Sequence, residues 1–308
     1  LCEDKEYNQR VPYEDLYALC GEVATDQDNT SNPATRHFSE ALASEAEQFL
    51  LRDKNNPPSD LFHTANEANF LISGVVREML SNSPDEIQGL EPLLAAIEEL
   101  DRVTIVTLNH DLLLEQLLKE HDVDFDDGFE ERGDGDVRSY SPERLFDGSN
   151  DVTVIKPHGS INWYYDWSQG QYFAFTSVPP NSVLGNFDLR PEPSILSGYR
   201  KEEKYTSDIF GDMVDAFILA LHDTSTMIES GFGWTDSGMV AHLCRYVERE
   251  EQNQLLLLHQ EDDFSEYHPL SIPPGFHKNG CFQNDGLLQN LNEYLSGTSW
   301  GEMKAQLE

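Results

Sequence analysis

The sequence predicts an α/β fold in which helices cover both faces of an open parallel sheet. Two observations predict it. Apolar residues recur at helical spacing in several segments, and short β-branched runs alternate with those segments along the chain. Strands that helices bury on both faces have this short, continuously apolar character. The prediction is therefore a Rossmann-like sheet, which binds ligands beyond the carboxyl ends of its strands.

Four apolar stripes predict helices whose apolar faces pack against the core. They lie within residues 38–50, 70–80, 90–100 and 209–221, and shorter stripes follow over 112–118 and 239–247. The β-branched or apolar runs that predict strands are residues 103–107, 152–155, 224–228 and 255–258.

Two stretches, 121–150 and 164–200, are rich in Asp, Gly and Ser or in Pro, and they are expected to be loops or excursions. We expect a single domain over residues 1–308. Its core covers about residues 30–260, and residues 261–308 form a C-terminal extension packed on that core.

Charge is the most unusual feature of the composition. The chain has 57 Asp and Glu against 20 Lys and Arg, a formal net charge of −37, spread along almost its whole length. In this it resembles the proteins of salt-accumulating archaea, in which molar salt shortens the Debye length to about 3 Å. An ordinary acidic cytosolic protein is the alternative, although so large a charge would self-repel strongly at low salt. The sequence has no basic stripe, so direct binding of nucleic acid is not expected.

Cysteine spacing and hydropathy restrict the class further. Cys2, Cys20, Cys244 and Cys281 form no CxxC pair, so no structural zinc or other metal site is expected. No apolar run approaches the roughly 18–20 residues that cross a membrane, and no signal peptide is visible. A cytoplasmic protein without membrane contact is therefore expected.

Polar clusters follow three of the predicted strands. After the first strand, Asn109 would sit at the strand tip with an amide that both donates and accepts, and Asp111 would cap the next helix. The second strand is followed by His158 and Gly159. The third is followed by residues 230–236, whose two glycines permit close approach of backbone to a ligand.

Each cluster also has an ordinary structural interpretation as a cap or a turn. Three of them in order at strand ends favour a ligand site. Two neighbouring features are not expected to belong to the site. His110 is expected to be non-catalytic, because alternation directs it away from its neighbours, and the run Asp122, Asp124, Asp126 is expected to be a solvated acidic loop because it lacks the glycine and glutamate of a calcium loop.

The sequences TLNHD at 107–111, KPHGSINW at 156–163 and SGFGWTD at 230–236 resemble the sirtuin-like family of bacteria and archaea. These are the silent-information-regulator-type domains of antiviral defence systems, and the resemblance extends from about Val103 to Leu258. It implies NAD as the substrate and Asn109 and His158 as catalytic residues. It also implies a set of NAD-binding residues: Asp111, Gly231, Phe232, Gly233 and Trp234.

The chain departs from the family pattern in two places. The family's glycine-rich pyrophosphate loop and the strand before it are not found, and because the chain opens at Leu1 without Met, we expect that preceding residues are missing. Leu108 stands where deacylating sirtuins carry Gln, and the four-cysteine zinc module of those enzymes has no counterpart here. Both differences weigh against protein deacylation.

The resemblance implies an NAD glycohydrolase that cleaves the nicotinamide–ribose bond and depletes NAD in antiviral defence. Such cleavage passes through an oxocarbenium-like centre. Asn109 would orient a water, and His158 would accept a proton. Restraint through a homo-oligomer or a protein partner is expected. One alternative is a catalytically silent nucleotide-sensing or assembly module, which the missing glycine loop supports. A weaker alternative is an NAD-dependent deacylase.

Overall fold

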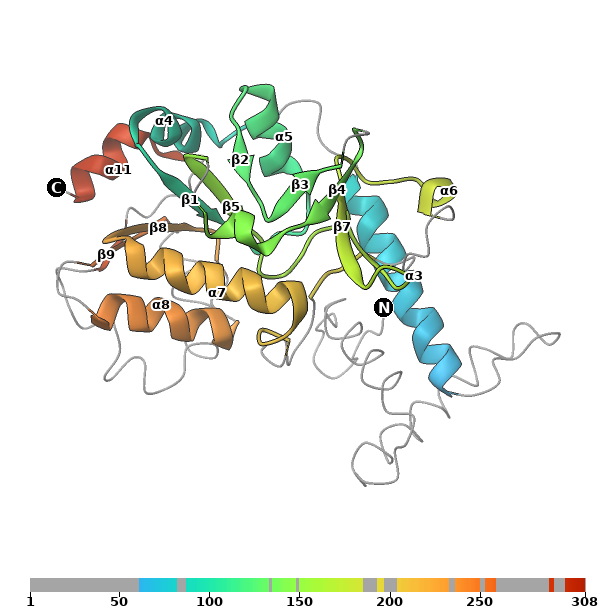
Figure 1. Ribbon diagram of the computed structural model, residues 1–308. Helices are drawn as coiled ribbons and strands as arrows, with labels where there is room; N and C mark the ends of the chain where they lie inside the picture. Colours follow the sequence, from blue (N-terminus) through green and yellow to red (C-terminus); the bar gives the residue numbers. More distant parts are fainter. Residues whose placement is uncertain are drawn as a thin grey trace, which may run out of the picture.

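The computed structural model describes ten segments of the chain: residues 61–81, 87–132, 135–147, 150–184, 193–196, 204–232, 236–249, 253–258, 288–290 and 297–307. The predicted helix over 38–50 lies outside these residues, as does most of the expected C-terminal extension. Figure 1 shows the described elements in their chain order.

Parallel strands form the centre of the molecule. β1 (Val103–Val106) and β2 (Phe125–Asp126) pair in parallel with opposite edges of β5 (Val152–Ile155), giving the order β1-β5-β2. A second parallel sheet has the order β10-β9-β8, with β8 at Thr226–Ser230, β9 at Gln254–Leu258 and β10 at Leu288–Asn290.

All four predicted strands are therefore present, and the parallel α/β prediction is confirmed. They fall into two hydrogen-bonded sheets, whereas the prediction was one continuous sheet. The two are joined by packing, because a single apolar cluster includes Val106 and Ile155 from the first sheet and Met227 and Leu255 from the second. Non-directional apolar contact can hold sheets together where no ladder of hydrogen bonds connects them.

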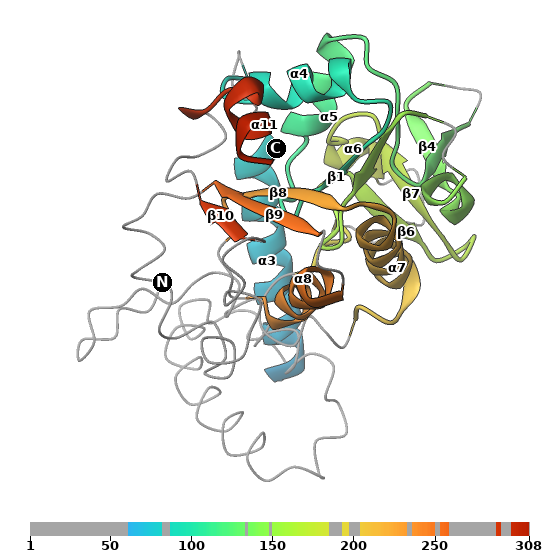
Figure 2. The ribbon, with the colours of Figure 1, turned by 90° about the vertical axis from the view of Figure 1, so that its left-hand side faces the viewer.

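Helices cover both sides of the parallel strands (Figures 1 and 2). On one side lie α7 (Asp208–Asp223) and α8 (Ser237–Arg249), and on the other lie α4 (Glu91–Glu99), α5 (Leu113–Glu120) and α11 (Trp300–Leu307). The apolar stripe predicted for 209–221 faces the core, since Met213 and Phe217 are buried there. None of the helices in the described segments is long and apolar enough to span a membrane.

The predicted loops over 121–150 and 164–200 contain a four-stranded antiparallel sheet, so that prediction is wrong for much of both stretches. The sheet has the order β3-β4-β7-β6, with β3 at Phe129–Glu131, β4 at Val137–Tyr140, β6 at Trp163–Asp166 and β7 at Gln171–Phe175. Two short helices follow strands of this sheet along the chain: η1 (Pro142–Leu145) comes after β4, and α6 (Asn181–Leu184) comes after β7. Aromatic residues are buried on both of its faces, with Trp163 on one face and Phe173 on the other. The polar composition of the connecting turns hid strands of only three to five residues.

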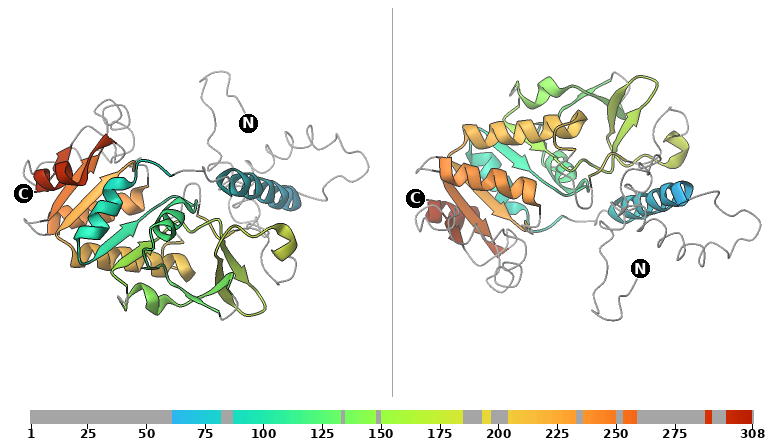
Figure 3. Two further views of the ribbon diagram at one scale, coloured as in Figure 1. Left: turned by 90° about the horizontal axis from the view of Figure 1, so that it is seen from above. Right: turned by 90° about the horizontal axis from the view of Figure 1, so that it is seen from below.

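Helix α3 (Leu61–Ser81) corrects a second expectation. Its apolar stripe was predicted to face the core, yet Leu71 and Met79 are each 70% exposed and only Val76 of the stripe is buried. Figure 3 shows α3 set at the edge of the sheets. Helical periodicity establishes that an apolar face exists, but it carries no information on what covers that face.

The acidic run after α5 is the third correction. Asp126 was expected to be solvated, but it is buried at the end of β2 and pairs with Arg144 at 2.7 Å. The next residue, Asp127, is buried as well, and its carboxylate accepts hydrogen bonds from both terminal nitrogens of Arg138, each at 2.8 Å. Buried carboxylates are stable only when paired and hydrogen-bonded, which explains why scarce arginines lie here.

Candidate functional site

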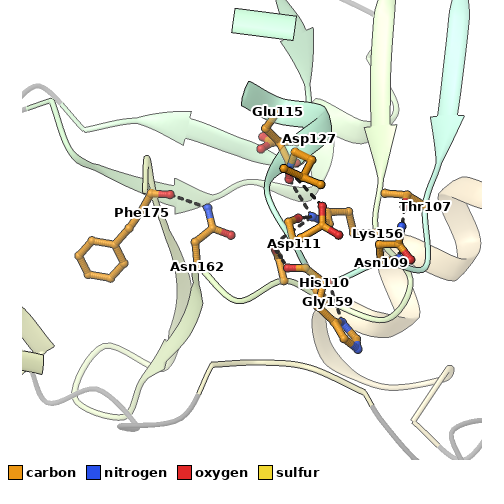
Figure 4. Close-up of polar contacts among 12 residues, drawn as sticks. Thr107, Asn109, His110, Asp111, Glu115, Asp127, Lys156, Gly159, Asn162 and Phe175 are labelled. Atoms are coloured by element: carbon orange, nitrogen blue, oxygen red, sulfur yellow. Dashed lines mark hydrogen bonds and ion pairs between the residues drawn. The ribbon is translucent and has the colours of Figure 1, made fainter. Parts of the chain in front are cut away.

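The turn after β1 carries the first predicted cluster. The Asn109 side chain is exposed, and its backbone N–H donates to Thr107 Oγ1 at 3.2 Å. The Asp111 carboxylate accepts the N–H of Leu113 at 3.0 Å, so it caps the first turn of α5 as expected, from one residue before the N-cap position. Figure 4 shows Asn109, His110 and Asp111 following one another in this turn.

The turn after β5 carries the second cluster. Its His158 side chain is 5% exposed, and the His158 carbonyl accepts the N–H of Leu196 at 2.7 Å. Gly159 has φ +78°, and a Cβ at this position would collide with the carbonyl oxygen of Ser194. Glycine is therefore required at position 159 by backbone conformation and close approach together.

The two turns lie against each other. The His110 carbonyl accepts the N–H of Ile161 at 3.0 Å and the hydroxyl of Ser160 at 3.2 Å. The His110 ring is buried, with its centroid 6.2 Å from that of His158. Within the β1 turn, alternation thus directs His110 inward toward His158 and leaves Asn109 at the surface.

Two residues outside the predicted site hold the ring of His158. Its Nε2 lies 2.9 Å from Asp236 Oδ2 and 2.8 Å from the Tyr205 hydroxyl, and that hydroxyl donates to Asp236 Oδ2 at 2.7 Å. Tyr205 precedes α7, and Asp236 lies directly before α8, where its Oδ1 accepts the N–H of Met239 at 3.1 Å. The end of β5 is thereby joined to the segment that follows β8.

Hydrogen bonding keeps Asp236 ionised. Burial raises the pKa of its carboxyl, but the bonds from His158, Tyr205 and the Met239 N–H outweigh burial and lower the pKa to about 2. An ionised carboxylate can only accept hydrogen bonds. The hydrogen between His158 and Asp236 therefore belongs to Nε2 of His158, and this network assigns Nδ1 as the ring nitrogen that accepts a proton when the imidazole is neutral.

The third cluster follows β8. Gly231 is exposed with φ +74°, and a Cβ there would meet nothing within 4 Å, so its backbone is open to close approach. The N–H of Phe232 donates to Oε1 of the buried Glu229 at 2.6 Å, and the Phe232 ring packs against the main apolar cluster. Gly233 and Trp234 lie outside the described residues.

Sequence reasoning found His158 but not the residues that orient it. Asp236 closes the predicted third cluster and precedes a helix, which was a usable signal for a capping residue. Tyr205 stands in a polar stretch with no strand before it, and nothing in the local pattern marks it. No group of three or more His, Cys, Asp or Glu side chains is arranged to hold a metal ion in the segments that the structure describes.

The family model described as "SIR2-like domain" matches residues 103–273, which contain all three strand-end clusters. No curated protein matches the chain.

Proposed function

The chain belongs to the SIR2-like domain family, and from this premise we propose that it is an NAD glycohydrolase. SIR2-like domains bind NAD, so membership supports an NAD-related activity. The proposed reaction replaces the bond between nicotinamide and ribose by a bond from water, releasing nicotinamide and ADP-ribose. A further proposal, supported by the resemblance to defence-system domains, is that this cleavage depletes NAD and is restrained by self-assembly or a partner protein.

The observation that carries the proposal is the orientation of His158. Its Nε2 is fixed by the ionised Asp236 and by Tyr205, so Nδ1 is the basic nitrogen of the neutral ring. A base oriented by a carboxylate in this way is an arrangement that serves proton abstraction in other hydrolases. We propose that Nδ1 accepts the proton of the attacking water or of a ribose hydroxyl.

Asn109 would bind the attacking water. Its amide is exposed at the carboxyl end of β1 and can accept and donate at once. Asp111, whose Oδ1 already accepts the N–H of Leu113, supports the backbone beside the ribose in this proposal. Gly231 and Phe232, with Gly233 and Trp234, would border the nucleotide after β8.

The test is incubation of the protein with NAD in molar potassium chloride, with nicotinamide and ADP-ribose separated by chromatography. Asn109→Ala and His158→Ala are each expected to lower turnover by about 100-fold or more, as for loss of a general base. His222→Ala, which removes an exposed histidine at the end of α7, is the matched control and should retain turnover. Wild-type turnover in both site variants contradicts the proposal. Nicotinamide release only with an acyl-lysine peptide would instead indicate deacylation.

A further inference from the structure

Lys156 is a buried lysine whose ammonium has a complete set of acceptors. The residue follows β5 directly, stands two positions before His158 and is 1% exposed. Its Nζ donates to the Asp111 carbonyl, to Glu115 Oε1 at 2.9 Å and to Ser160 Oγ at 3.1 Å. Three donors therefore meet three acceptors, and the Glu115 carboxylate balances the charge.

Two of those acceptors lie close in sequence to the candidate catalytic residues. Asp111 comes two positions after Asn109, and Ser160 comes two positions after His158. Ser160 Oγ in turn donates to the His110 carbonyl, which closes a ring of hydrogen bonds between the two turns. Figure 4 shows Lys156 lying between the β1 turn and the start of α5.

Resting on the proposed function, we infer that Lys156 is a positioning residue that sets the β1 turn carrying Asn109 against the β5 turn carrying His158. Each of the two candidate catalytic residues is carried by one of these turns, so a shift of one turn against the other changes the distance between Asn109 and His158. Displacement of a reacting group by about 1 Å can lower a rate about 100-fold. Lys156 would thus control turnover without touching the substrate.

Stability and positioning can be separated with a double variant. Lys156→Met alone leaves Glu115 as a buried unpaired carboxylate, which destabilises any fold. Lys156→Met with Glu115→Gln removes both charges and restores a neutral interior. We expect this double variant to melt close to wild type, to lose about 100-fold in kcat and to keep KM within a few-fold. A purely structural lysine predicts recovery of kcat together with stability.

The matched control is a second buried ion pair outside the site. Arg138→Met with Asp127→Asn removes a cation and a carboxylate whose side chains are 17% and 5% exposed, and its kcat is expected to stay at the wild-type value. If the Lys156 double variant does not fold, Ser160→Ala removes one acceptor and the bond to His110 without leaving a buried charge. That variant is expected to lower kcat several-fold with KM unchanged.

Amide hydrogen exchange gives a readout that does not depend on turnover. The amides of residues 107–112 and 158–161 should exchange faster in the Lys156 double variant or in Ser160→Ala, and should be unchanged in the Arg138 double variant. Wild-type protection in both turns, with wild-type kcat, overturns the inference. If the wild-type protein does not cleave NAD, the proposed function fails, while the exchange measurement still decides whether Lys156 fixes the two turns.

Discussion

Replacement of Asp236 by Asn tests the network around His158 most directly. The substitution keeps the size of the side chain and an oxygen that can cap α8 through the Met239 N–H. It places an amide donor or a neutral oxygen where an ionised oxygen accepts from His158 and Tyr205 at 2.9 and 2.7 Å. Charge-assisted bonds are lost, and a donor–donor conflict arises if the amide nitrogen faces His158.

The size of the effect follows from the pKa of Asp236. Its value falls from an ordinary 3.8 to about 2 on folding, and one pKa unit corresponds to ~1.4 kcal/mol, so the ionised carboxylate stabilises the fold by about 2 kcal/mol. Loss of a hydrogen bond to a charged group independently gives ~1.5–3 kcal/mol. Because the folded pKa is the lower one, this stability is fully present above the unfolded value and is lost as the pH falls from about 4 to about 2.

Urea unfolding in a fixed concentration of potassium chloride measures this difference. Asp236→Asn should lower the free energy of unfolding by about 2 kcal/mol at pH 7, and the deficit should shrink as the pH falls below about 4. Asp101→Asn removes one exposed carboxylate and controls for net charge. A deficit at pH 7 no larger than that of the Asp101 variant would refute the reasoning, and so would a deficit that does not change with pH.

Two further predictions concern the backbone and the surface. Gly159→Ala should cost at least ~3 kcal/mol in a urea unfolding experiment, because positive φ and a collision with the Ser194 carbonyl act together. Gly135→Ala, also at positive φ but with nothing within 4 Å of the added Cβ, should cost only ~1–2 kcal/mol, and equal costs would contradict the steric argument. Raising potassium chloride from ~0.1 M to ~2 M should raise the urea midpoint, because screening weakens repulsion in a chain of net charge −37. A constant or falling midpoint would show that charge repulsion does not limit the stability of the fold.

Long periodic segments and continuously apolar strands could be predicted from the sequence, whereas short strands that contain polar residues could not. Apolar residues recur at helical spacing along the 16 residues of α7, so the face that packs against the core could be predicted. The strands β3 and β4 have three and four residues, too few for alternation to stand out among acidic turn residues. The exposure of the apolar side chains on α3 could not be predicted either, because it depends on which elements the fold packs against that helix.

The candidate site divides in the same way. Asn109 and His158 are placed by the ends of β1 and β5, and the rule for open α/β sheets finds them without a structure. Tyr205 reaches His158 from 47 positions away, and Asp236 from 78 positions away. Such contacts depend on how α7 and α8 pack on the strands, which no local pattern encodes.

Charges at the surface and charges in the interior of this protein should respond differently to salt. Cations number 20 against 57 acidic residues, yet Arg138, Arg144 and Lys156 are each bonded to a buried carboxylate. Repulsion among surface carboxylates weakens with salt, whereas buried pairs are screened much less. Salt should therefore act mainly on the folded fraction and leave the bonds of the site intact. Turnover per folded molecule should accordingly vary less with potassium chloride than the fraction of molecules that is folded.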